Sequence, residues 1–478
     1  MEMERNDGPR AARNAAAVFA AARRAWCGCA GMRQRRRRYK DFTYGRQWGD
    51  TVTTPDGTVM TEGEYASLNG KVPLTNNLIR QLVKSVVGRY RHVMASEKDS
   101  AAKCRAEARA NCLDEMDSRM MEEFLISGCA VQRIVRERRA GRGGCRVWVD
   151  NVSPERFFVN RFTDPRGWDI ELVGMLHDMS LREAVMRFGC RRPGLAGRIA
   201  AIYSAIDSGT AAVGAGDAEE ADFTVAAPGR CRVIEVWALE SRAVLRCHDT
   251  LRGEFFVVDE DSAPAIGRIN SRRAGTGEGA IAVRPDMAVE WRCYMFAPDG
   301  TLLHTFLSPY AHGSHPFAVK LYPMTDGEVH PFVEDVIDQQ RHVNRLITLI
   351  DHIMSYSAKG VLMFPVDQKL PEMSWREVGD RWSRCNGVIP YIPTGDELPT
   401  QMHTTGGDAG AHALLSLEMK LFEQISGVSS ALSGRTTGGI NGKGLNDSLV
   451  ENATIALLDI FETFGSFRAE RDAKLRNS

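Results

Sequence analysis

The sequence has no net charge, no C-x-x-C pair and no long apolar run, and each absence argues against one class of protein. Its 61 Lys and Arg balance 61 Asp and Glu, whereas a protein that grips DNA over its whole surface is strongly basic. Its 11 cysteines are scattered, which suits free thiols in a reducing compartment and argues against a zinc ribbon or a disulfide framework. The apolar stretch at 15–32 is interrupted by Arg23 and Arg24 and is too short to span a bilayer. The basic run RQRRRRYK that follows argues against a signal peptide.

Signatures of catalysis are also missing. The sequence contains no G-x-S-x-G, no H-E-x-x-H and no acidic metal cluster. The stretch GGINGKG at 438–444 fails as a phosphate loop, because one residue is missing between its glycines, Gly444 replaces the Ser or Thr that holds magnesium, and the preceding segment is helical. His312 and His315 form an H-x-x-H without a carboxylate pair nearby, which is typical of ordinary loop histidines. The sequence therefore predicts a protein that is not an enzyme and holds no metal or cofactor.

The charge is uneven along the chain. Residues 1–46 carry twelve Lys or Arg against four Asp or Glu, so the remainder is net acidic. Two interpretations of the segment 1–40, with its RRRR at 35–38, stay open: a solvated basic arm, or a contact to nucleic acid or an acidic partner.

Helical and strand-like patterns alternate up to about residue 322. Apolar spacing predicts a helix from Leu78, capped by Thr75 or Asn76, and a second helix that ends at Gly128. CAVQRIVRE and CRVWVDNV are predicted strands joined by the turn AGRGG. Ser180 and Glu183 predict a capping box. From about 229 to 322 the pattern is mainly β, and YMFAPDGTLLHTF predicts a hairpin that turns at Asp299-Gly300.

The C-terminal third has a different order. It is predicted to begin with one helix of roughly 28 residues that ends at Gly360. A Pro-rich region with VLMFPV and GVIPYIP as strand candidates follows, and then a second helix that Gly427 ends. A glycine-rich loop leads into a final helix, capped by Asn446 or Asp447.

This order resembles the portal, or head–tail connector, proteins of tailed bacteriophages, most closely the short-tailed type. The resemblance covers about 325–470 well and is weaker over the preceding segment. The residues that match an I-D-x-Q-x-x-x-N core in the family's first stem helix are Ile337, Asp338, Gln340 and Asn344. The stretch GVSSALSGRTTGGINGKGLND resembles the family's turn into the next helix, although 441–444 departs from the Ser-Gly-x-Ala that is frequent there.

The resemblance implies an α+β, portal-like fold with a short or absent crown. Its implied parts are a basic N-terminal arm at 1–40, an α/β wing at 41–328, stem helix 1 at 329–359, a β-rich clip at 360–406, stem helix 2 at 407–427, a tunnel loop at 428–445 and a C-terminal wing or crown helix at 446–478.

The function implied by the resemblance is that of a ring, expected to be dodecameric, at one capsid vertex of the virion. The ring would conduct double-stranded DNA during packaging and ejection, and a near-neutral channel wall would touch DNA without gripping it. Its implied partners are terminase, head–tail adaptor or tail proteins and the major capsid protein, with no membrane. Assembly is expected in the host cytoplasm.

Two groups of residues are expected to carry this role. In the tunnel loop, the residues expected to face passing DNA are Arg435, Thr436, Thr437, Asn441 and Lys443. In the clip, the residues expected to contact terminase are Trp375, Trp382 and Tyr391. For each group an alternative stays open: the loop merely connects two helices, and the aromatic residues form the clip's own core.

Two other functions also stay open. One is a nucleic-acid-processing enzyme with a basic arm, which needs an acidic metal cluster that the sequence does not show. The other is a monomeric, capsid-associated adaptor. Ring formation separates the portal interpretation from both.

Overall fold

The computed structural model describes most of the chain and divides it into two compact units. The described residues are 8–97, 105–139, 146–189, 194–207, 222–226, 228–357, 361–383, 388–393, 399–402, 408–428 and 455–477. The first unit comprises Met1–Arg36, Glu97–Pro331 and Ile460–Ser478, and the second comprises Arg37–Ser96 and Phe332–Asp459. Residues 41–96, which the sequence assigned to the wing, thus group with the C-terminal third. No helix among the described residues combines the length and apolarity that crossing a membrane requires.

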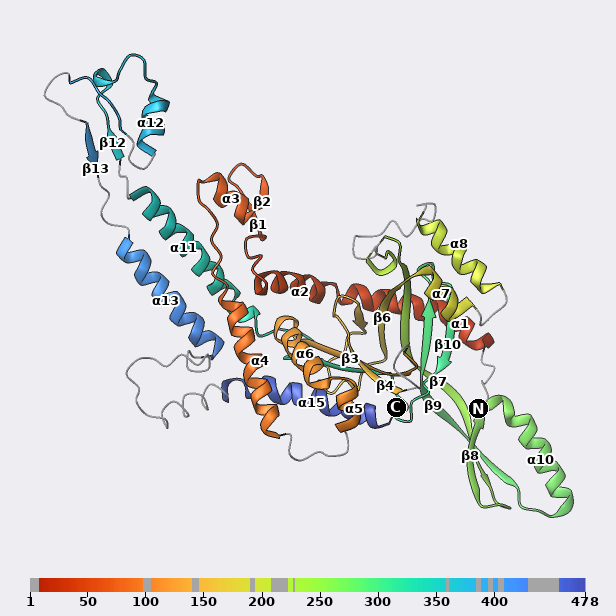
Figure 1. Cartoon of the computed structure of the whole chain (residues 1–478). Helices are drawn as coiled ribbons and strands as arrows, with labels where there is room; N and C mark the ends of the chain where they lie inside the picture. Colours follow the sequence, from red (N-terminus) through yellow and green to blue (C-terminus); the bar gives the residue numbers. More distant parts are fainter. Residues whose placement is uncertain are drawn as a thin grey trace. The chain divides into compact units, whose positions relative to one another are not determined.

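The first unit is built on an antiparallel six-stranded sheet. Its strand order is β10-β9-β7-β6-β5, and β8 pairs with β7 (Figure 1). The strands are β5 Phe157–Val159, β6 Leu172–Met179, β7 Cys231–Asp249, β8 Glu254–Asp259, β9 Ile281–Phe296 and β10 Leu302–Leu307. The β9–β10 hairpin predicted from the sequence is confirmed: its Gly300 has a φ of +82°, a left-handed conformation that favours glycine.

A second antiparallel sheet, in the order β11-β3-β4, belongs to the same unit. Its strands are β3 Cys129–Glu137, β4 Arg146–Asn151 and β11 Phe317–Leu321. A buried carboxylate joins the two sheets, since Glu235 of β7 lies 3.0 Å from Arg133 of β3 and 2.6 Å from His177 of β6. Burial alone would raise the pKa of Glu235, but Arg133 and His177 lower it well below its ordinary value. The carboxylate therefore stays ionised inside the protein.

Two N-terminal helices, α1 Gly8–Gly28 and α2 Ala30–Thr43, precede these sheets. Helix α1 contacts β5, β6, β7 and β10. Its Trp26 is 1% exposed and packs against Phe158 and Phe223, while Phe19 packs edge-on against Phe296. The N-terminal segment is therefore part of the hydrophobic core.

The interpretation of residues 1–40 as a solvated basic arm is wrong for two of the arginines. Arg33 is 1% exposed, and its guanidinium lies 3.6 Å from the centre of the Trp26 ring. Arg36 is 4% exposed and pairs with Glu123 at 2.6 Å and Glu155 at 3.0 Å. Arg33 and Arg36 are three residues apart, so they lie on the same face of the helix and are buried together. The run of charges in the sequence does not show which arginines lie on that face.

The other helices of the first unit surround the sheets. They are α5 Arg105–Ala110, α6 Leu113–Ser127, α7 Leu181–Phe188, α8 Leu195–Asp207, α10 Ala263–Thr276 and most of α15 Leu458–Arg476. As predicted, α6 ends at Gly128, whose φ is +65° and where a Cβ would lie 2.8 Å from the Tyr322 carbonyl oxygen. One half of the predicted capping box is confirmed as well, because Ser180 Oγ accepts a hydrogen bond from the Glu183 N–H.

The long strands extend beyond this core as a ribbon. β7 and β9 stay paired as far as Asp249 and Ile281, with β8 on the other side of β7 and α10 alongside (Figure 1). A small cluster of Leu245, Cys247, Ile266 and Ile281 is buried there. Only Ile266 of α10 is buried, so most of that helix faces solvent.

The second unit consists mainly of helices. They are α3 Glu62–Leu68, α4 Leu78–Glu97, α11 Ile337–Ser357, α12 Trp375–Ser383 and α13 Asp408–Ser426. Its short strands are β1 Thr51–Thr53, β2 Val59–Thr61, β12 Val361–Met363 and β13 Thr400–Met402, which pair as β1-β2 and β12-β13. Helices α11 and α13 pack side by side, and α12 with the β12–β13 pair lies between them in sequence (Figure 1).

Three predictions in this unit need correction. The first long helix begins at Ile337 rather than near residue 330, because a 3-10 turn at Glu334–Val336 follows Pro331. Residues 388–393 of GVIPYIP are not a strand, since two prolines there lack the N–H that a β ladder requires, and β13 pairs with β12 instead. The cap of α4 is neither Thr75 nor Asn76: Asn77 Oδ1 accepts from the Arg80 N–H at 3.0 Å.

Candidate functional site

A row of buried polar side chains lies along α11 in the second unit. Gln340, Asn344 and Thr348 are 0%, 2% and 3% exposed. They are spaced by four residues, which places them on one face of the helix. Buried polar groups are costly unless they are hydrogen-bonded, so their partners determine what this face does. We call these three residues the α11 ladder.

Gln340 caps the start of α4. Its Oε1 accepts hydrogen bonds from the N–H groups of Leu78 at 2.9 Å and Ile79 at 3.2 Å. Its Nε2 donates to the Asn76 carbonyl at 2.7 Å and to Asn344 Oδ1 at 3.0 Å. The first N–H groups of a helix have no hydrogen-bond partner within that helix. Gln340, which lies on α11, provides the acceptor for two such N–H groups of α4.

Asn344 and Thr348 continue the same contact along the chain before α4. Asn344 Oδ1 accepts from the Asn76 N–H at 3.0 Å, and its Nδ2 donates to Gln47 Oε1 at 2.6 Å. Thr348 Oγ1 accepts from the Leu74 N–H at 3.0 Å. The ladder thus fixes the backbone of 74–79 against α11 through neutral hydrogen bonds.

A second, charged contact lies on the neighbouring face of α11. Glu62, the first residue of α3, has a side chain that is 8% exposed, and it pairs with Arg341 at 3.1 Å and with Arg345. Of the four core residues expected from the sequence, Ile337, Gln340 and Asn344 are buried, whereas the Asp338 side chain is 79% exposed. Three of the four therefore stabilise the position of α11 in its unit.

The aromatic residues expected in the clip are only partly buried. Trp375 is 47% exposed and Tyr391 39%, and Trp375 lies near Phe364 and Lys369. Trp382 is half-buried. The buried side chains here are instead Gln368, Met373 and Val378. Much of the Trp375 and Tyr391 surface is thus available to a partner.

The expected tunnel-loop residues lie outside the described part of the chain. Arg435, Thr436, Thr437, Asn441 and Lys443 fall between Val428, where the description stops after α13, and residue 455, where it resumes. The GGINGKG stretch and the caps at Asn446 or Asp447 lie there too. α13 belongs to the second unit, and α15 from Ile460 onward belongs to the first.

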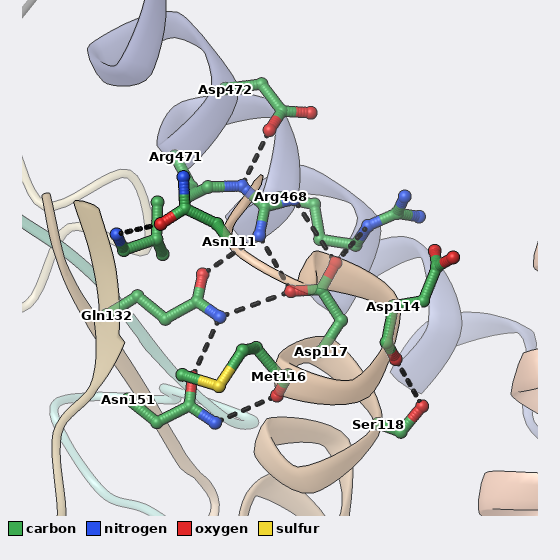
Figure 2. A network of polar contacts seen from close by, with 11 residues as sticks. Asn111, Asp114, Met116, Asp117, Ser118, Gln132, Asn151, Arg468, Arg471 and Asp472 are labelled. Carbon is green, nitrogen blue, oxygen red and sulfur yellow. Dashed lines mark hydrogen bonds and ion pairs between the residues drawn. The ribbon is translucent and has the colours of Figure 1, made fainter. Parts of the chain in front are cut away.

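A buried charge network holds α15 in the first unit (Figure 2). Arg471 of α15, whose side chain is 2% exposed, lies 2.7 Å from a carboxylate oxygen of Asp117 on α6, and Arg468 lies 3.2 Å from the other oxygen. Gln132 of β3 bridges the pair, donating to Asp117 and accepting from Arg471. We call Asp117, Gln132, Arg468 and Arg471 the α15 anchor.

The environment of the anchor keeps its charges in place. Burial alone would lower the pKa of Arg471, but Asp117 and Asp472 raise it above its ordinary value, so the guanidinium stays charged. Asn151 of β4 accepts a hydrogen bond from Gln132 Nε2 and donates one to the Met116 carbonyl, which ties α6 to the sheet (Figure 2). The sequence carries no local signal of this network, because Asp117 and Arg471 are 354 positions apart.

The histidine pair shows no sign of a metal site. His315 is buried against Trp291, and its Nδ1 accepts from the Phe317 N–H at 3.3 Å. Burial and the nearby Lys474 ammonium lower the pKa of His315 well below its ordinary value, so the ring is neutral. Within the described residues no three His, Cys, Asp or Glu side chains come together as metal ligands would.

Comparison with known families decides what this arrangement belongs to. A family model of the phage P22-like portal protein matches residues 20–444, most of the chain. The chain belongs to the phage P22-like portal protein family. No curated protein matches it. The resemblance to short-tailed phage portals and the α+β portal fold predicted from the sequence are thereby confirmed.

Membership in the portal family defines the general role. Portal proteins of this family are structural, non-enzymatic virion proteins of genome packaging, and they form homo-oligomeric rings in the context of the capsid vertex and terminase. The match includes the α11 ladder and stops at residue 444, before α15 begins.

Proposed function

We propose that this portal protein forms the ring through which double-stranded DNA enters and leaves the capsid, and that it docks terminase and then tail adaptors. The observation that carries this proposal is the arrangement of α11 and α13. They pack against each other and are connected through a small β-rich element, as stem helices connected through a clip would be. In this assignment α11 lies in stem helix 1 at 329–359, the clip is 360–406, and α13 lies in stem helix 2 at 407–427.

The α11 ladder supports this assignment physically. A conduit wall has to keep its shape while DNA moves past it, and a helix whose polar side chains bond to backbone groups is fixed in both rotation and position. Gln340, Asn344 and Thr348 together make such bonds to the segment 74–79. Backbone groups have no rotamers to change, so these hydrogen bonds hold α11 rigidly against the segment 74–79.

The clip and the loop supply the contacts of the proposed conduit. The exposed surfaces of Trp375 and Tyr391, with Trp382, would bind terminase and adaptors through aromatic contacts. Arg435 and Lys443 would meet phosphates transiently, and Thr436, Thr437 and Asn441 would give polar contact without tight neutralisation. Twelve subunits would form the ring. The ring would contact the major capsid protein and would assemble in the host cytoplasm.

The loop offers the sharpest test of the conduit. In particles assembled with Arg435→Glu/Lys443→Glu protein, we expect normal rings but reduced packaged DNA, because the altered charges repel phosphates. The matched control is Arg268→Glu/Arg272→Glu on the exposed side of α10, which should leave the DNA content unchanged. Particles of the loop variant that hold the normal amount of DNA would show that the loop is only a connector.

Catalysis should be absent from the purified protein. We expect no hydrolysis of ATP and no cleavage of DNA, so packaging energy would come from terminase. Hydrolysis that Lys443→Ala abolishes would contradict this proposal and would restore the phosphate-loop interpretation of GGINGKG.

A further inference from the structure

The ribbon of the first unit has two strand edges, one on β8 and one on β9. β7 lies between these two strands and pairs with both (Figure 1). In an antiparallel sheet the N–H and C=O groups of a strand point alternately to its two sides. On an edge strand, every second residue therefore directs both groups away from the sheet. Such groups pair readily with another strand unless something else bonds to them.

The edge of β9 is protected by side chains. The N–H and C=O groups of Ile281 point away from β7 and bond to the side-chain amide of Asn270 at 2.8 and 2.9 Å. By alternation, the outward groups of this strand belong to odd-numbered residues. Among these, Pro285 has no N–H, and the Met287 N–H donates to Asp286 Oδ1 at 2.9 Å. The β9 edge therefore offers few donors to another strand.

The edge of β4 is protected in the same way. Asn111 Nδ2 donates to the Val147 carbonyl at 3.2 Å, and Asn111 Oδ1 accepts from the Val149 N–H at 2.9 Å. On both edges the side chain of an asparagine takes the place of a neighbouring strand. Natural proteins protect their edges by such means because an open edge pairs with other chains.

The edge of β8 lacks this protection. The N–H of Thr250, just after β7, donates to the Ala280 carbonyl, so even-numbered residues of β7 bond to β9 and odd-numbered ones face β8. Their partners on β8 have even numbers, so the odd-numbered residues of β8 point outward. These outward residues are Phe255, Val257 and Asp259. Their backbone N–H and C=O groups form no hydrogen bond with the residues that the structure describes.

The side chains along this open edge are apolar on one face of the ribbon. Phe255 is 81% exposed and Val257 is 51% exposed. They are two residues apart on one strand, so they lie on the same face. His248 of β7 stacks on the Phe255 ring with 4.2 Å between the ring centres, which supports the ring at the edge. A strand added here would place its own side chains beside these two.

The charge of the open edge is negative at the base of the ribbon. Residues 252–261 contain four acidic side chains and one basic side chain. At the far end, the exposed Glu254 is accompanied by the exposed Arg252. At the base, Asp259 already pairs with Arg242. The two acidic residues that follow it are exposed and form no ion pair with the described residues; they are Glu260 and Asp261.

A second copy of the ribbon is a poor occupant of this edge. Its β9 edge is protected, as described above. Two β8 strands could pair with each other in the antiparallel register that matches all three outward residues. That register places Glu254 of each strand opposite Glu260 of the other, and like charges directly opposite each other are destabilising.

We propose that the open edge of β8 binds an extended, basic segment of a partner protein, which adds a strand to the ribbon. The segment runs antiparallel, as all strand pairs of this sheet do. Its main chain bonds to the outward groups of β8, and its alternate side chains determine specificity. Apolar residues lie opposite Phe255 and Val257, and Lys or Arg lies opposite Glu260 and Asp261. This contact is separate from the DNA channel and goes beyond the function proposed above.

A synthetic peptide tests the proposal with the full-length protein. The probe is a capped, fluorescein-labelled peptide in which a short run of lysines precedes alternating threonine and valine. Fluorescence anisotropy should show saturable binding. Val257→Pro should raise the Kd by about tenfold or more, because proline removes an outward donor. The matched control is Val289→Pro, which changes an exposed outward position on the β9 edge and should leave the Kd unchanged.

Charge and backbone contributions are tested separately. Glu260→Lys/Asp261→Lys should also raise the Kd, whereas Glu462→Lys, an exposed position on α15, should not. A peptide with N-methylated valines keeps its charge but loses the donors that face β8, so it should bind at least about tenfold more weakly. This peptide gives a result even where a protein variant fails to fold.

Hydrogen exchange locates the contact. In the free protein the amides of Phe255, Val257 and Asp259 should exchange rapidly, and the peptide should slow their exchange. Slow exchange without peptide would show that the edge is already covered, by a second copy or by another segment, and would overturn the proposal. Absence of saturable binding would also overturn it. Equal binding of the N-methylated peptide would show attraction between charges without strand addition, and would overturn it as well.

Discussion

Helices α11 and α15 are both held by buried polar side chains, but with different chemistry. The α11 ladder bonds mainly to neutral backbone groups of 74–79. The α15 anchor instead pairs two arginines with the single carboxylate of Asp117. Loss of a ladder residue leaves unpaired amide groups, whereas loss of an anchor residue leaves a buried ion. Equal burial thus produces unequal sensitivity to mutation.

The largest expected effect is on the anchor. Arg471→Met removes the main partner of the buried Asp117 carboxylate, and it should lower the unfolding free energy by about 3 kcal/mol or more. Urea unfolding followed by tryptophan fluorescence, at one fixed protein concentration because assembly adds stability, measures the change.

The double variant Asp117→Asn/Arg471→Met sharpens this prediction. It removes the carboxylate together with its main partner, so it should be less destabilised than Arg471→Met alone. A double variant that is clearly less stable than the single one would show that the ion pair itself, and not the stranded charge, determines the cost.

The ladder should show a smaller effect. Gln340→Leu leaves the N–H groups of Leu78 and Ile79 without their partner, and we expect a loss of about 2 kcal/mol in the same unfolding measurement. The adjacent Asp338→Asn is the matched control: its side chain is 79% exposed, so the change should stay below about 0.5 kcal/mol. Equal losses of unfolding free energy from Gln340→Leu and Asp338→Asn would show that the α11 ladder does not stabilise the fold.

A pH dependence of stability should come from the two histidines that lie near Lys474 of α15. Burial and Lys474 of α15 lower the pKa of His312 to about 4 and lower that of His315 well below its ordinary value. Both rings are therefore neutral in the folded protein but take up protons when unfolded. Their contribution is fully present above the unfolded pKa of about 6.5 and is lost as pH falls toward 4, by at most about 1.4 kcal/mol per pH unit for each histidine.

The variant His315→Asn checks this dependence. Its unfolding free energy should fall less steeply than that of the wild type between pH 6.5 and 5, a window above the usual titration of carboxylates. Glu470, which lies 3.1 Å from Lys474, is the acidic group at the same site. Parallel slopes for the two proteins would contradict the assignment to His315.

The parts of the fold that the sequence predicted are those with local signals. Apolar periodicity located α11, α13 and α6, and an Asp-Gly pair located the β9–β10 turn. These features depend on residues within a few turns or within one hairpin, so composition and spacing are sufficient.

The features that escaped prediction depend on residues far apart in the chain. The RRRR run suggested a solvated arm, but Arg36 is buried because Glu123, 87 positions away, meets it. Thr400–Met402 has little strand character of its own and becomes β13 by pairing with β12. The α15 anchor joins Asp117 to Arg471, 354 positions later, and no single segment signals it.

Imaging of the purified protein tests the central claim most directly. Negative-stain electron microscopy, with the molar mass measured by light scattering on the same sample, should show closed rings with a central hole and a mass that is a multiple of the 52.9 kDa chain. A chain that remains monomeric at every concentration tested, with no rings on the grid, would contradict the portal conduit proposed for it.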